Sequence, residues 1–391
     1  MPAPLLLDLS HTSHTRARTG IQRVARGLLA ALGDGALPIT HDPHAKAWRP
    51  LEPWERANLA APGGAGKRGA RWPLRARLRG RLQRALGGKR GAWPAHAGLV
   101  VPEVFSPGVA AALPALLAGA RGPRVALFHD AIALKFPELS PAGTVGRFPA
   151  YLVELLAFDG IAAVSEDSRA SLTDYWAWLG VALPPPVRAI PLGIAPQVSP
   201  AGGEKSPAAA GPVVLSVGSI EGRKNHLALL EACEARWAAG DVFSLHLVGL
   251  AQPQTAGAAL GRIRELQAAG RPVRYDGPVD DAAVARAYAA CTFTVYPSLV
   301  EGFGLPVIES VAQGKPCVCS ARGALGESAA GGGCLALDRV DAPSLAAAIG
   351  RLLRAPEECA ALAAAARARR LRTWADYARD LTDWMAGVPR R

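Results

Sequence analysis

The segment Tyr296–Gln313, YPSLVEGFGLPVIESVAQ, is the feature that most constrains the fold of this 391-residue chain. It begins within the apolar, β-branched run CTFTVYPS, which predicts a buried strand. Gly302 and Gly304 permit a tight loop that brings backbone amides close to a ligand. Pro306 indicates a helix start, because proline is favoured at the first helical position. A strand, a glycine loop and a helix N-terminus in this order are typical of open α/β sheets that bind anions.

The same segment holds two carboxylates, Glu301 and Glu309. We expect Glu301 in the loop and Glu309 near the first turn of the helix. Three interpretations are open. The pair could be the general acid and the nucleophile of a glycoside hydrolase. They could instead accept hydrogen bonds from a sugar and a ribose, or be a solvated loop residue and a helix-capping residue.

The length of the chain exceeds the ~250–300 residues at which single cores stop growing, so we expect two domains. The six cysteines show no metal-ligand spacing and fit a reducing cytoplasm. We expect no signal peptide, because the N-terminus lacks a basic region and Asp8 interrupts its apolar run. Prolines interrupt the long uncharged stretch at 104–120, so it does not read as a membrane span.

The net charge of +12 is concentrated in residues 67–90, which contain ten basic residues and no acidic one. Leucines recur there at every fourth position, at Leu74, Leu78, Leu82 and Leu86. This pattern predicts a basic amphipathic helix of the kind that lies in an anionic membrane interface. Its surface-binding residues would be Arg75, Arg77, Arg79 and Arg81. The alternative is an Arg-rich surface helix docked through its leucines. Nucleic acid is not expected, because no reader motif accompanies the charge.

Strand and helix patterns divide the chain. Residues 1–196 predict an N-terminal α/β domain with a basic insert at about 41–98. Residues 197–211 are rich in Pro, Gly and Ala and read as a linker. Residues 212–371 restart the alternation of strand and helix as a second domain, and 372–391 form a terminal helix that could pack back on the first.

Two positions of the first domain are candidates for ligand contact. Thr19 and Gly20 lie at the start of the helix predicted at 21–32, where Gly20 offers backbone N–H groups to an anion, unless Thr19 is simply a helix cap. His129 ends a buried strand at the carboxyl edge, where sites form in such sheets. It could orient a substrate hydroxyl or be structural.

A second basic pair, Arg223 and Lys224, follows a glycine-bearing strand end in SVGSIEGRKNH. A guanidinium fork and a point charge at a helix N-terminus suit a diphosphate, although adjacent basic residues often face solvent. Together with the two glutamates they predict a site for a nucleotide-diphosphate sugar, with Val279 in a turn beside the base.

Four segments of the chain resemble retaining glycosyltransferases of the GT-B fold, family 4 type. They are AVSEDSR at 163–169, VGSIEGRKN at 217–225, YDGPVDDAAVARAYAAC at 275–291 and PSLVEGFGLPVIES at 297–310. The resemblance implies an α/β chain with two Rossmann-like, doubly wound domains facing across a cleft. TGIQRV at 19–24 resembles the first domain of bacterial polysaccharide mannosyl- and rhamnosyltransferases.

The resemblance also implies roles for single residues. Arg223 and Lys224 would stabilise the leaving diphosphate, Glu301 would bind the donor sugar, and His129 would contact it near the reacting carbon. Donor-binding residues would be Gly20, Val279, Phe303, Gly304, Leu305 and Glu309, with Glu309 on the ribose. Neither a metal nor a cofactor is expected, since the nucleotide sugar is a co-substrate and an Asp-x-Asp motif is absent from the sequence.

The expected reaction is transfer of a hexose to a polysaccharide, O-antigen or lipid-linked acceptor by a front-face mechanism. The first candidate donor is GDP-mannose, on the TGIQRV resemblance alone. The enzyme would be cytoplasmic and peripheral at the inner face of the membrane. The alternatives are a glycoside hydrolase using Glu301 and Glu309, and a non-catalytic membrane- or nucleic-acid-binding protein using 67–90. A nucleotide-sugar epimerase would share the fold type but need no acceptor.

Overall fold

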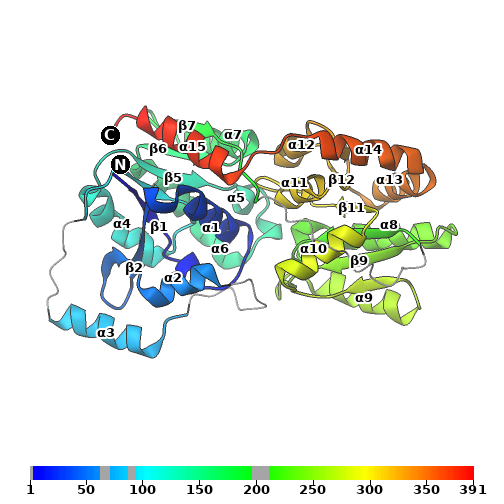
Figure 1. Cartoon of the computed structure of the whole chain (residues 1–391), viewed down its shortest axis with the longest axis horizontal. Coiled ribbons are helices and arrows are strands. Elements are labelled where there is room, and N and C mark those ends of the chain that lie inside the picture. The colour runs from blue at the N-terminus through cyan, green and yellow to red at the C-terminus, as the bar shows by residue number, and fades with distance from the viewer. Residues whose placement is uncertain (1–2, 62–70, 87–92, 196–210) are drawn as a thin grey trace. The chain divides into compact units, whose positions relative to one another are not determined.

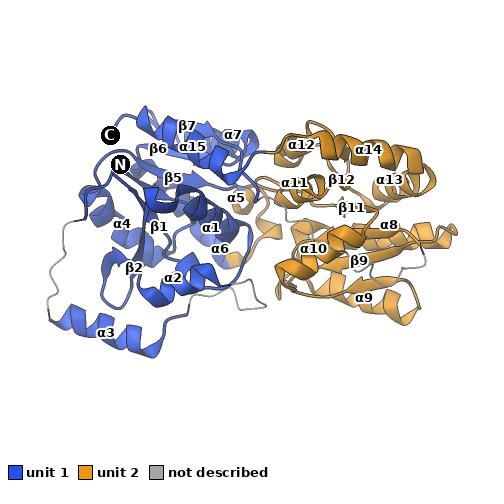
Figure 2. Ribbon diagram, in the orientation of Figure 1, with its two compact units in different colours: residues 1–131, 143–195, 372–391 blue, residues 132–142, 196–371 orange. Residues whose placement is uncertain are grey.

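The computed structural model describes residues 3–61, 71–86, 93–195 and 211–391. The chain forms two compact units (Figure 2). Unit 1 contains residues 1–131, 143–195 and 372–391, and unit 2 contains 132–142 and 196–371. Residues 132–142, assigned to the first domain from the sequence, therefore group with unit 2. The expected linker at 197–211 lies outside the described residues except for its last position.

Unit 1 is built on a seven-stranded sheet in the order β3-β2-β1-β4-β5-β6-β7 (Figure 1). The strands are parallel except for β3, which pairs antiparallel with β2. The chain winds outward from β1 in one direction and then from β4 in the other, so the order reverses between these two strands. Their bounds are β1 (Leu5–Asp8), β2 (Ala36–Asp42), β3 (Ala47–Pro50), β4 (Gly98–Val101), β5 (Arg124–Phe128), β6 (Gly160–Ala163) and β7 (Val187–Ala189).

The helices of unit 1 follow the expected apolar spacing where that spacing is strong. Val24 and Leu28 of α1 are fully buried, and Gly33 ends the helix with a positive φ of 52°. Ser165 caps α7 through its hydroxyl, as predicted. The helices are α1 (Gly20–Leu32), α2 (Pro53–Ala60), α3 (Leu74–Ala85), α4 (Pro107–Gly119), α6 (Ala142–Glu154), α7 (Glu166–Trp178) and α15 (Trp374–Ala386).

Strands β2 and β3 and helix α2 were not predicted. Pro38 lies within β2 and argues against predicting an interior strand there, since proline has no backbone N–H to donate to a neighbouring strand. The strand nevertheless pairs with β1 over four residues and buries Ile39 completely. Long-range pairing therefore decided this region against its weak local pattern.

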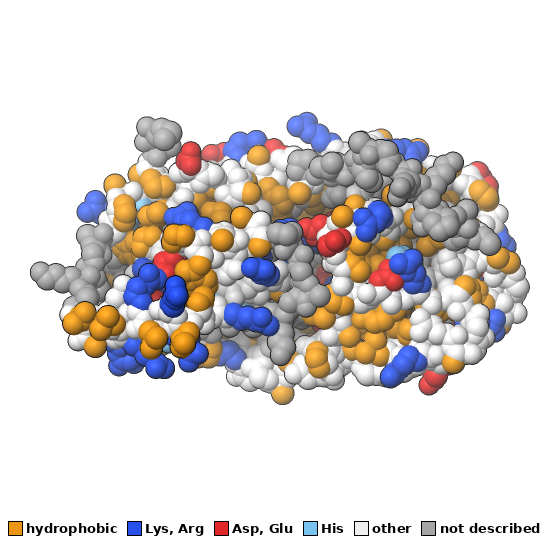
Figure 3. Space-filling view, turned by 60° about the horizontal axis from the view of Figure 1, so that its bottom comes forward, with side chains coloured by type: hydrophobic (Ala, Val, Ile, Leu, Met, Phe, Trp, Pro, Cys, Tyr) orange, Lys and Arg blue, Asp and Glu red, His pale blue; other side chains and the backbone are white. Residues whose placement is uncertain are grey.

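The leucines of α3 point away from the body of unit 1. Leu74, Leu78, Leu82 and Leu86 are 56–76% exposed, and Figure 3 shows hydrophobic and basic side chains side by side over this helix, at the lower left. The interpretation that α3 docks through its leucines is therefore wrong. The helix instead buries Ala76 and Gly80, and the absence of a side chain at Gly80 lets its backbone approach the β2–β3 turn.

Unit 2 is built on a six-stranded parallel sheet in the order β10-β9-β8-β11-β12-β13. The order reverses between β8 and β11. The strands are β8 (Val213–Val217), β9 (Ser244–Val248), β10 (Val273–Tyr275), β11 (Phe293–Tyr296), β12 (Cys317–Ser320) and β13 (Cys334–Leu337). The predicted alternation of strand and helix in this region is confirmed.

Helices on the sheet of unit 2 enclose one large apolar core. Val214, Phe293 and Val318 of the strands pack with Leu229 and Leu345 of the helices in that core. The helices of the unit are α5 (Ile132–Lys135), α8 (His226–Ala238), α9 (Gly257–Ala268), α10 (Asp281–Ala290), α11 (Leu305–Ala312), α12 (Gly323–Ala329), α13 (Ala342–Arg354) and α14 (Pro356–Ala368).

The terminal helix α15 belongs to unit 1, although it follows unit 2 in the sequence. Thr373 and Asp376 form a capping box at its start. The helix packs on α1, where Gly27 leaves room for the indole of Trp374. Tyr377 and Leu381 are fully buried by this contact and its surroundings.

Candidate active site

The loops that follow β8 and β11 meet at the carboxyl edge of the sheet in unit 2. The two strands are hydrogen-bonded neighbours on either side of the point where the strand order reverses. The loops are joined directly, since the Leu299 amide donates to the Arg223 carbonyl over 2.9 Å. Open α/β sheets bind ligands at this position, at the carboxyl ends of the strands where the strand order reverses.

The loop after β8 presents its two cations just ahead of a helix. A 3₁₀ turn covers Gly222–Lys224, and Asn225 then adopts a left-handed conformation with φ 55° before α8 begins at His226. The side-chain amide of Asn225 holds this turn, since its Nδ2 donates to the Val340 carbonyl over 2.7 Å. The arrangement sets Arg223 and Lys224 beside the positive end of the α8 dipole.

The loop after β11 brings Glu301 onto these cations. Its carboxylate lies 2.7 Å from Nη1 of Arg223 and 2.5 Å from Nζ of Lys224. The hydroxyl of Tyr296, the last residue of β11, donates to the same carboxylate over 2.9 Å. Glu221 forms a further ion pair with Arg223 at 2.8 Å. The sequence predicted neither Tyr296 nor Glu221 as part of the site; an aromatic at a strand end and an acid beside the basic pair were the available signals.

The charges of this cluster determine the protonation of Glu301. Burial raises its pKa, but Arg223 and Lys224 outweigh burial and lower the pKa to about 2. Burial also lowers the pKa of Lys224, while Glu301 opposes that shift. A carboxyl with a pKa near 2 is ionised at neutral pH. It therefore cannot be the general acid that a glycoside hydrolase requires, whose pKa is raised instead.

The N-terminus of α11 lies in the same loop. Gly304 caps it with φ 97°, a conformation that L-residues rarely adopt. A Cβ at Gly304 would also approach the side chain of Leu325 to 3.0 Å. The hydroxyl of Ser328 donates to the Phe303 carbonyl and holds the loop from the other side. The amides of Phe303, Gly304 and Leu305 thus occupy a rigid turn at the positive end of α11.

Glu309 lies deeper than predicted. It is the fifth residue of α11, which places it in the second helical turn rather than the first, and its side chain is buried. The interpretation of Glu309 as a helix cap is therefore wrong, because Gly304 holds that position.

Val279 follows β10 in a turn at the same edge of the sheet. The carboxylate of Asp276 fixes the start of this turn. Its two oxygens lie 2.9 Å from Nε2 of His246 and 2.7 Å from Nε of Arg274. The next residue, Asp280, caps α10. Val279 packs against the apolar cluster around Tyr288, so its backbone is fixed at the loop.

Two predicted residues belong to unit 1. Gly20 is the first residue of α1, and a Cβ built on it would meet none of the described atoms within 4 Å. Packing within unit 1 does not require glycine there. His129 follows β5 and is buried, with Nε2 2.7 Å from the carbonyl of Pro102. Burial lowers the pKa of His129, so the ring is neutral at pH 7 and Nε2 carries the proton toward Pro102.

Comparison with known sequences identifies the C-terminal part of the chain. Residues 211–355 match the family described as glycosyl transferases group 1. They contain the joined loops of β8 and β11. This part of the chain, residues 211–355, is similar in sequence to the group 1 glycosyltransferases.

A curated relative supports this assignment over a longer stretch. The serotype-specific mannosyltransferase WbdA of Escherichia coli is 27% identical over 344 residues, which cover 80% of this chain. The match covers 38% of WbdA, so this chain spans little more than a third of its relative's length.

Solved structures show that the fold of this chain is GT-B. Sucrose-phosphate synthase from Thermosynechococcus elongatus superposes with a TM-score of 0.68 at 21% identity, covering 98% of both chains. The HepE protein of Anabaena in complex with UDP and glucose gives 0.66 at 15% identity, covering 98% of this chain and 100% of HepE.

Unit 1 contains a pair of buried carboxyl groups that the sequence did not predict. Asp8 ends β1 and Glu103 follows β4, so both lie where the strand order of this sheet reverses. Glu103 accepts hydrogen bonds from the amides of His11 and Thr12 at 2.8 Å. Asp8 accepts from the amide and hydroxyl of Ser10. Burial and the charge of Glu103 raise the pKa of Asp8 to about 7.

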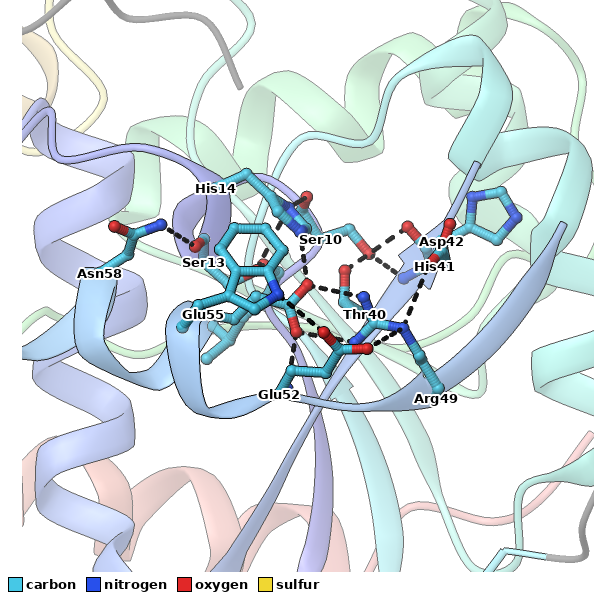
Figure 4. Close-up of polar contacts among 12 residues, drawn as sticks. Ser10, Ser13, His14, Thr40, His41, Asp42, Arg49, Glu52, Glu55 and Asn58 are labelled. Carbon is cyan, nitrogen blue, oxygen red and sulfur yellow. Dashed lines mark hydrogen bonds and ion pairs between the residues drawn. The ribbon is translucent and has the colours of Figure 1, made fainter. Parts of the chain in front are cut away.

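A second network fastens α2 to the loop after β1 (Figure 4). Glu55 is fully buried and lies 2.7 Å from both Nε2 of His14 and Nη1 of Arg49. Burial raises the pKa of Glu55, but hydrogen bonds from His14 and Arg49 outweigh it and lower the pKa to about 2. The sequence carried no usable signal for Glu55, because the spacing of apolar residues in so short a helix does not show that a charged side chain faces inward.

The four predicted membrane-surface arginines all lie exposed on α3. Within the described residues, no helix combines the length and the apolar character needed to cross a bilayer.

Proposed function

We propose that this glycosyltransferase transfers mannose from GDP-mannose to a polysaccharide, O-antigen or lipid-linked acceptor with retention of configuration. One observation carries the proposal: Arg223 and Lys224 meet Glu301 at the point where the strand order of unit 2 reverses. The TGIQRV segment and the similarity to WbdA favour mannose as the donor sugar.

The cation pair fits a diphosphate. Arginine offers a planar fork that suits phosphate oxygens, and lysine adds a compact charge beside it. In the protein alone, the carboxylate of Glu301 forms ion pairs with both cations, and Glu221 supplies the second negative charge through its ion pair with Arg223. A bound diphosphate would share them and free Glu301 to accept hydrogen bonds from sugar hydroxyls.

The remaining contacts of the donor follow from the loops around this pair. The amides of Phe303, Gly304 and Leu305 would donate to the sugar and the phosphates at the positive end of α11. Glu309 would accept from the ribose, and the backbone near Val279 would contact the base. From unit 1, we assign Gly20 to the phosphates and His129 to the donor sugar.

The proposed reaction is a front-face substitution. The bond between the anomeric carbon and the diphosphate oxygen breaks, and the acceptor oxygen bonds to the same face of that carbon. The acceptor proton passes to the departing diphosphate, so charge and atoms balance without a protein nucleophile. Arg223 and Lys224 would stabilise the negative charge that develops on the leaving group. Neither a metal nor a cofactor is part of this proposal.

We place the reaction at the inner face of the cytoplasmic membrane, where a lipid-linked acceptor is available. The proposal requires only peripheral association.

A thermal-shift screen against GDP, UDP, ADP, CMP and dTDP tests the donor. GDP is expected to raise the melting temperature most, because a ligand that binds only the native state stabilises it. GDP-mannose is then incubated with acceptor glycans, and the anomeric configuration of the product is read by NMR. Inverted product would contradict retention, and stabilisation by UDP alone would contradict the donor.

Lys224→Met tests the role of the cation pair in the proposed reaction, because methionine keeps the side-chain length and removes the charge. We expect the transfer rate to fall by about 10²–10³-fold, the usual loss for one charge-stabilising group. Arg262→Met on α9, far along the chain from both loops, is the control. Unchanged transfer by Lys224→Met would remove the cation pair from the mechanism, and hydrolysis of a glycan without nucleotide would favour the hydrolase.

A further inference from the structure

Helix α3 is held to unit 1 by a face of small residues. Ala76 and Gly80 are buried, and Gly80 lies against the turn between β2 and β3. A Cβ at Gly80 would lie 2.9 Å from the Cβ of His44 and 3.1 Å from the amide nitrogen of Ala45. Glycine therefore permits a backbone contact at this position that other residues would push apart.

The start of α3 is anchored by aromatic and ionic contacts. Trp72 stacks on the ring of His14 with centroids 4.1 Å apart, and the guanidinium of Arg49 lies 5.7 Å from the Trp72 ring. One turn into the helix, Arg79 forms an ion pair with Glu52. These contacts, together with the buried small residues, set which face of α3 is turned outward.

The outward face is the leucine stripe. At about 100° per residue, Leu74, Leu78 and Leu82 lie on average about 180° from Ala76 and Gly80 around the helix. The stripe is therefore diametrically opposite the docked face. Exposure agrees with this geometry, and the stripe is visible with its basic neighbours in Figure 3.

Arginines flank the stripe on both sides. By the same helical geometry, Arg75 and Arg79 lie on one flank, and the other flank holds Arg77, Arg81 and Arg84. Residues 71–86 contain no acidic side chain. An apolar ridge between two rows of guanidinium groups is complementary to a partner that has an apolar interior beneath a layer of anionic groups.

We propose that α3 is a docking helix for an anionic lipid bilayer. It lies parallel to the membrane, its leucines enter the acyl region, and its flanking arginines bind lipid phosphates in the headgroup layer. Apolar burial and charge attraction then act together, and the small-residue face leaves α3 attached to unit 1 while it is inserted. This inference does not depend on which nucleotide sugar the enzyme uses.

The charge pattern argues against the other occupants of such a face. A second copy of the chain would bring its own arginines against those of the first, which repel. Nucleic acid would take the arginines but leave the exposed leucines without a role, since its phosphate backbone offers them no apolar surface. A bilayer is the partner that uses both.

The test is co-sedimentation of the full chain with phosphatidylcholine vesicles, with and without phosphatidylglycerol, at low and high salt. Three variants are compared. The first replaces the stripe by Leu74→Ser, Leu78→Ser and Leu82→Ser. The second replaces the flanks by Arg75→Gln, Arg77→Gln and Arg81→Gln, leaving Arg79 with Glu52. The control carries Leu183→Ser and Val242→Ser, which are 79% and 74% exposed elsewhere on the protein.

We expect the wild type and the control to sediment with phosphatidylglycerol vesicles and both α3 variants to lose at least about tenfold in partitioning. High salt is expected to weaken binding without abolishing it, because only the arginine contribution is screened. Melting temperatures should be unchanged in the leucine variant, since its altered side chains are exposed.

Three outcomes would overturn the proposal. Binding by the leucine variant equal to that of the wild type would show that the leucines do not insert. A concentration-dependent dimer in light scattering, lost in that variant and without vesicle binding, would assign the face to a second copy. Equal sedimentation with and without phosphatidylglycerol would remove the role of the arginines. Transfer to a water-soluble acceptor, measured without vesicles, should be the same in all variants and reports separately on the proposed function.

Discussion

At the scale of single residues, the candidate site is a charge cluster that is already neutralised in the protein alone. Lys224 and Glu301 are separated by 77 positions and meet at 2.5 Å only because β8 and β11 are neighbours. Each ion compensates the burial of the other, which would otherwise be costly for either. Ligand binding at this cluster is therefore an exchange of anionic partners rather than the burial of new charge.

Asp8 illustrates the opposite case, a buried carboxyl whose pKa is raised by a charge of the same sign, that of Glu103. Its pKa of about 7 means that the folded state holds a proton which the unfolded chain releases near pH 4. Since the native state binds more protons, stability falls as pH rises from about 4 to about 7. Above pH 7 the Asp8 carboxyl is ionised in both the folded and the unfolded state, so its contribution to the free energy of unfolding no longer changes with pH.

We predict that Asp8→Asn makes the protein more stable than the wild type at pH 8 and removes part of the slope between pH 4 and 7. Asparagine keeps the Oδ1 acceptor that receives both hydrogen bonds of Ser10. The gain is about 1.4 kcal/mol for each pKa unit removed. Urea unfolding at several pH values measures it. Asp34→Asn, in a short turn after α1, is the control, and a wild-type slope in Asp8→Asn would refute the assignment.

At the scale of elements, α3 shows that helix periodicity does not specify which side of a helix is docked. Its leucines form the only regular apolar pattern in residues 71–86, yet the protein buries the opposite face. The determining contact is the close approach of Gly80 to the β2–β3 turn, where a larger side chain has no space.

Gly80→Ala is therefore expected to destabilise the protein, although alanine is the better helix former by about 1 kcal/mol. The added methyl group would meet the Ala45 backbone at about 3.1 Å and force α3 outward. Gly146→Ala in α6, where a Cβ meets nothing within 4 Å, is the matched control and should be neutral or stabilising. Thermal unfolding compares the two. A gain of stability in Gly80→Ala would mean that α3 is not docked through this face.

At the scale of the whole molecule, the chain crosses between its units more than once. It enters unit 2 at 132–142, returns to unit 1, and after unit 2 ends on unit 1 again with α15. The last helix thus completes the unit that the first residues begin.

Removal of residues 372–391 is expected to destabilise unit 1 selectively. It would uncover the face of α1 around Gly27 and the apolar side chains buried beneath Tyr377 and Leu381. Hydrogen exchange should show lost protection in α1 and β1, with protection in α8 and α13 kept. A variant that removes only the last residue, Arg391, is the control. Equal loss of protection in both units would contradict the assignment of α15 to unit 1.

Local patterns in the sequence determined much of this protein. The alternation of strand and helix predicted the doubly wound unit 2, and the resemblance to GT-B enzymes implied the same kind of fold for unit 1. The glycine loop, the proline after it and the basic pair predicted where the site lies, because each depends on backbone preferences of a few adjacent residues. The capped terminal helix and the exposed arginines of α3 were likewise readable from short-range spacing.

Only the tertiary structure decided the partners of those residues. Glu301 faces Lys224, Glu103 faces Thr12 91 positions away, and the leucines of α3 face outward. These outcomes depend on which strands become neighbours and on how closely two backbones can approach. Periodicity marks an apolar face or a charged residue but does not encode its distant partner, since the contact exists only once the sheet has formed.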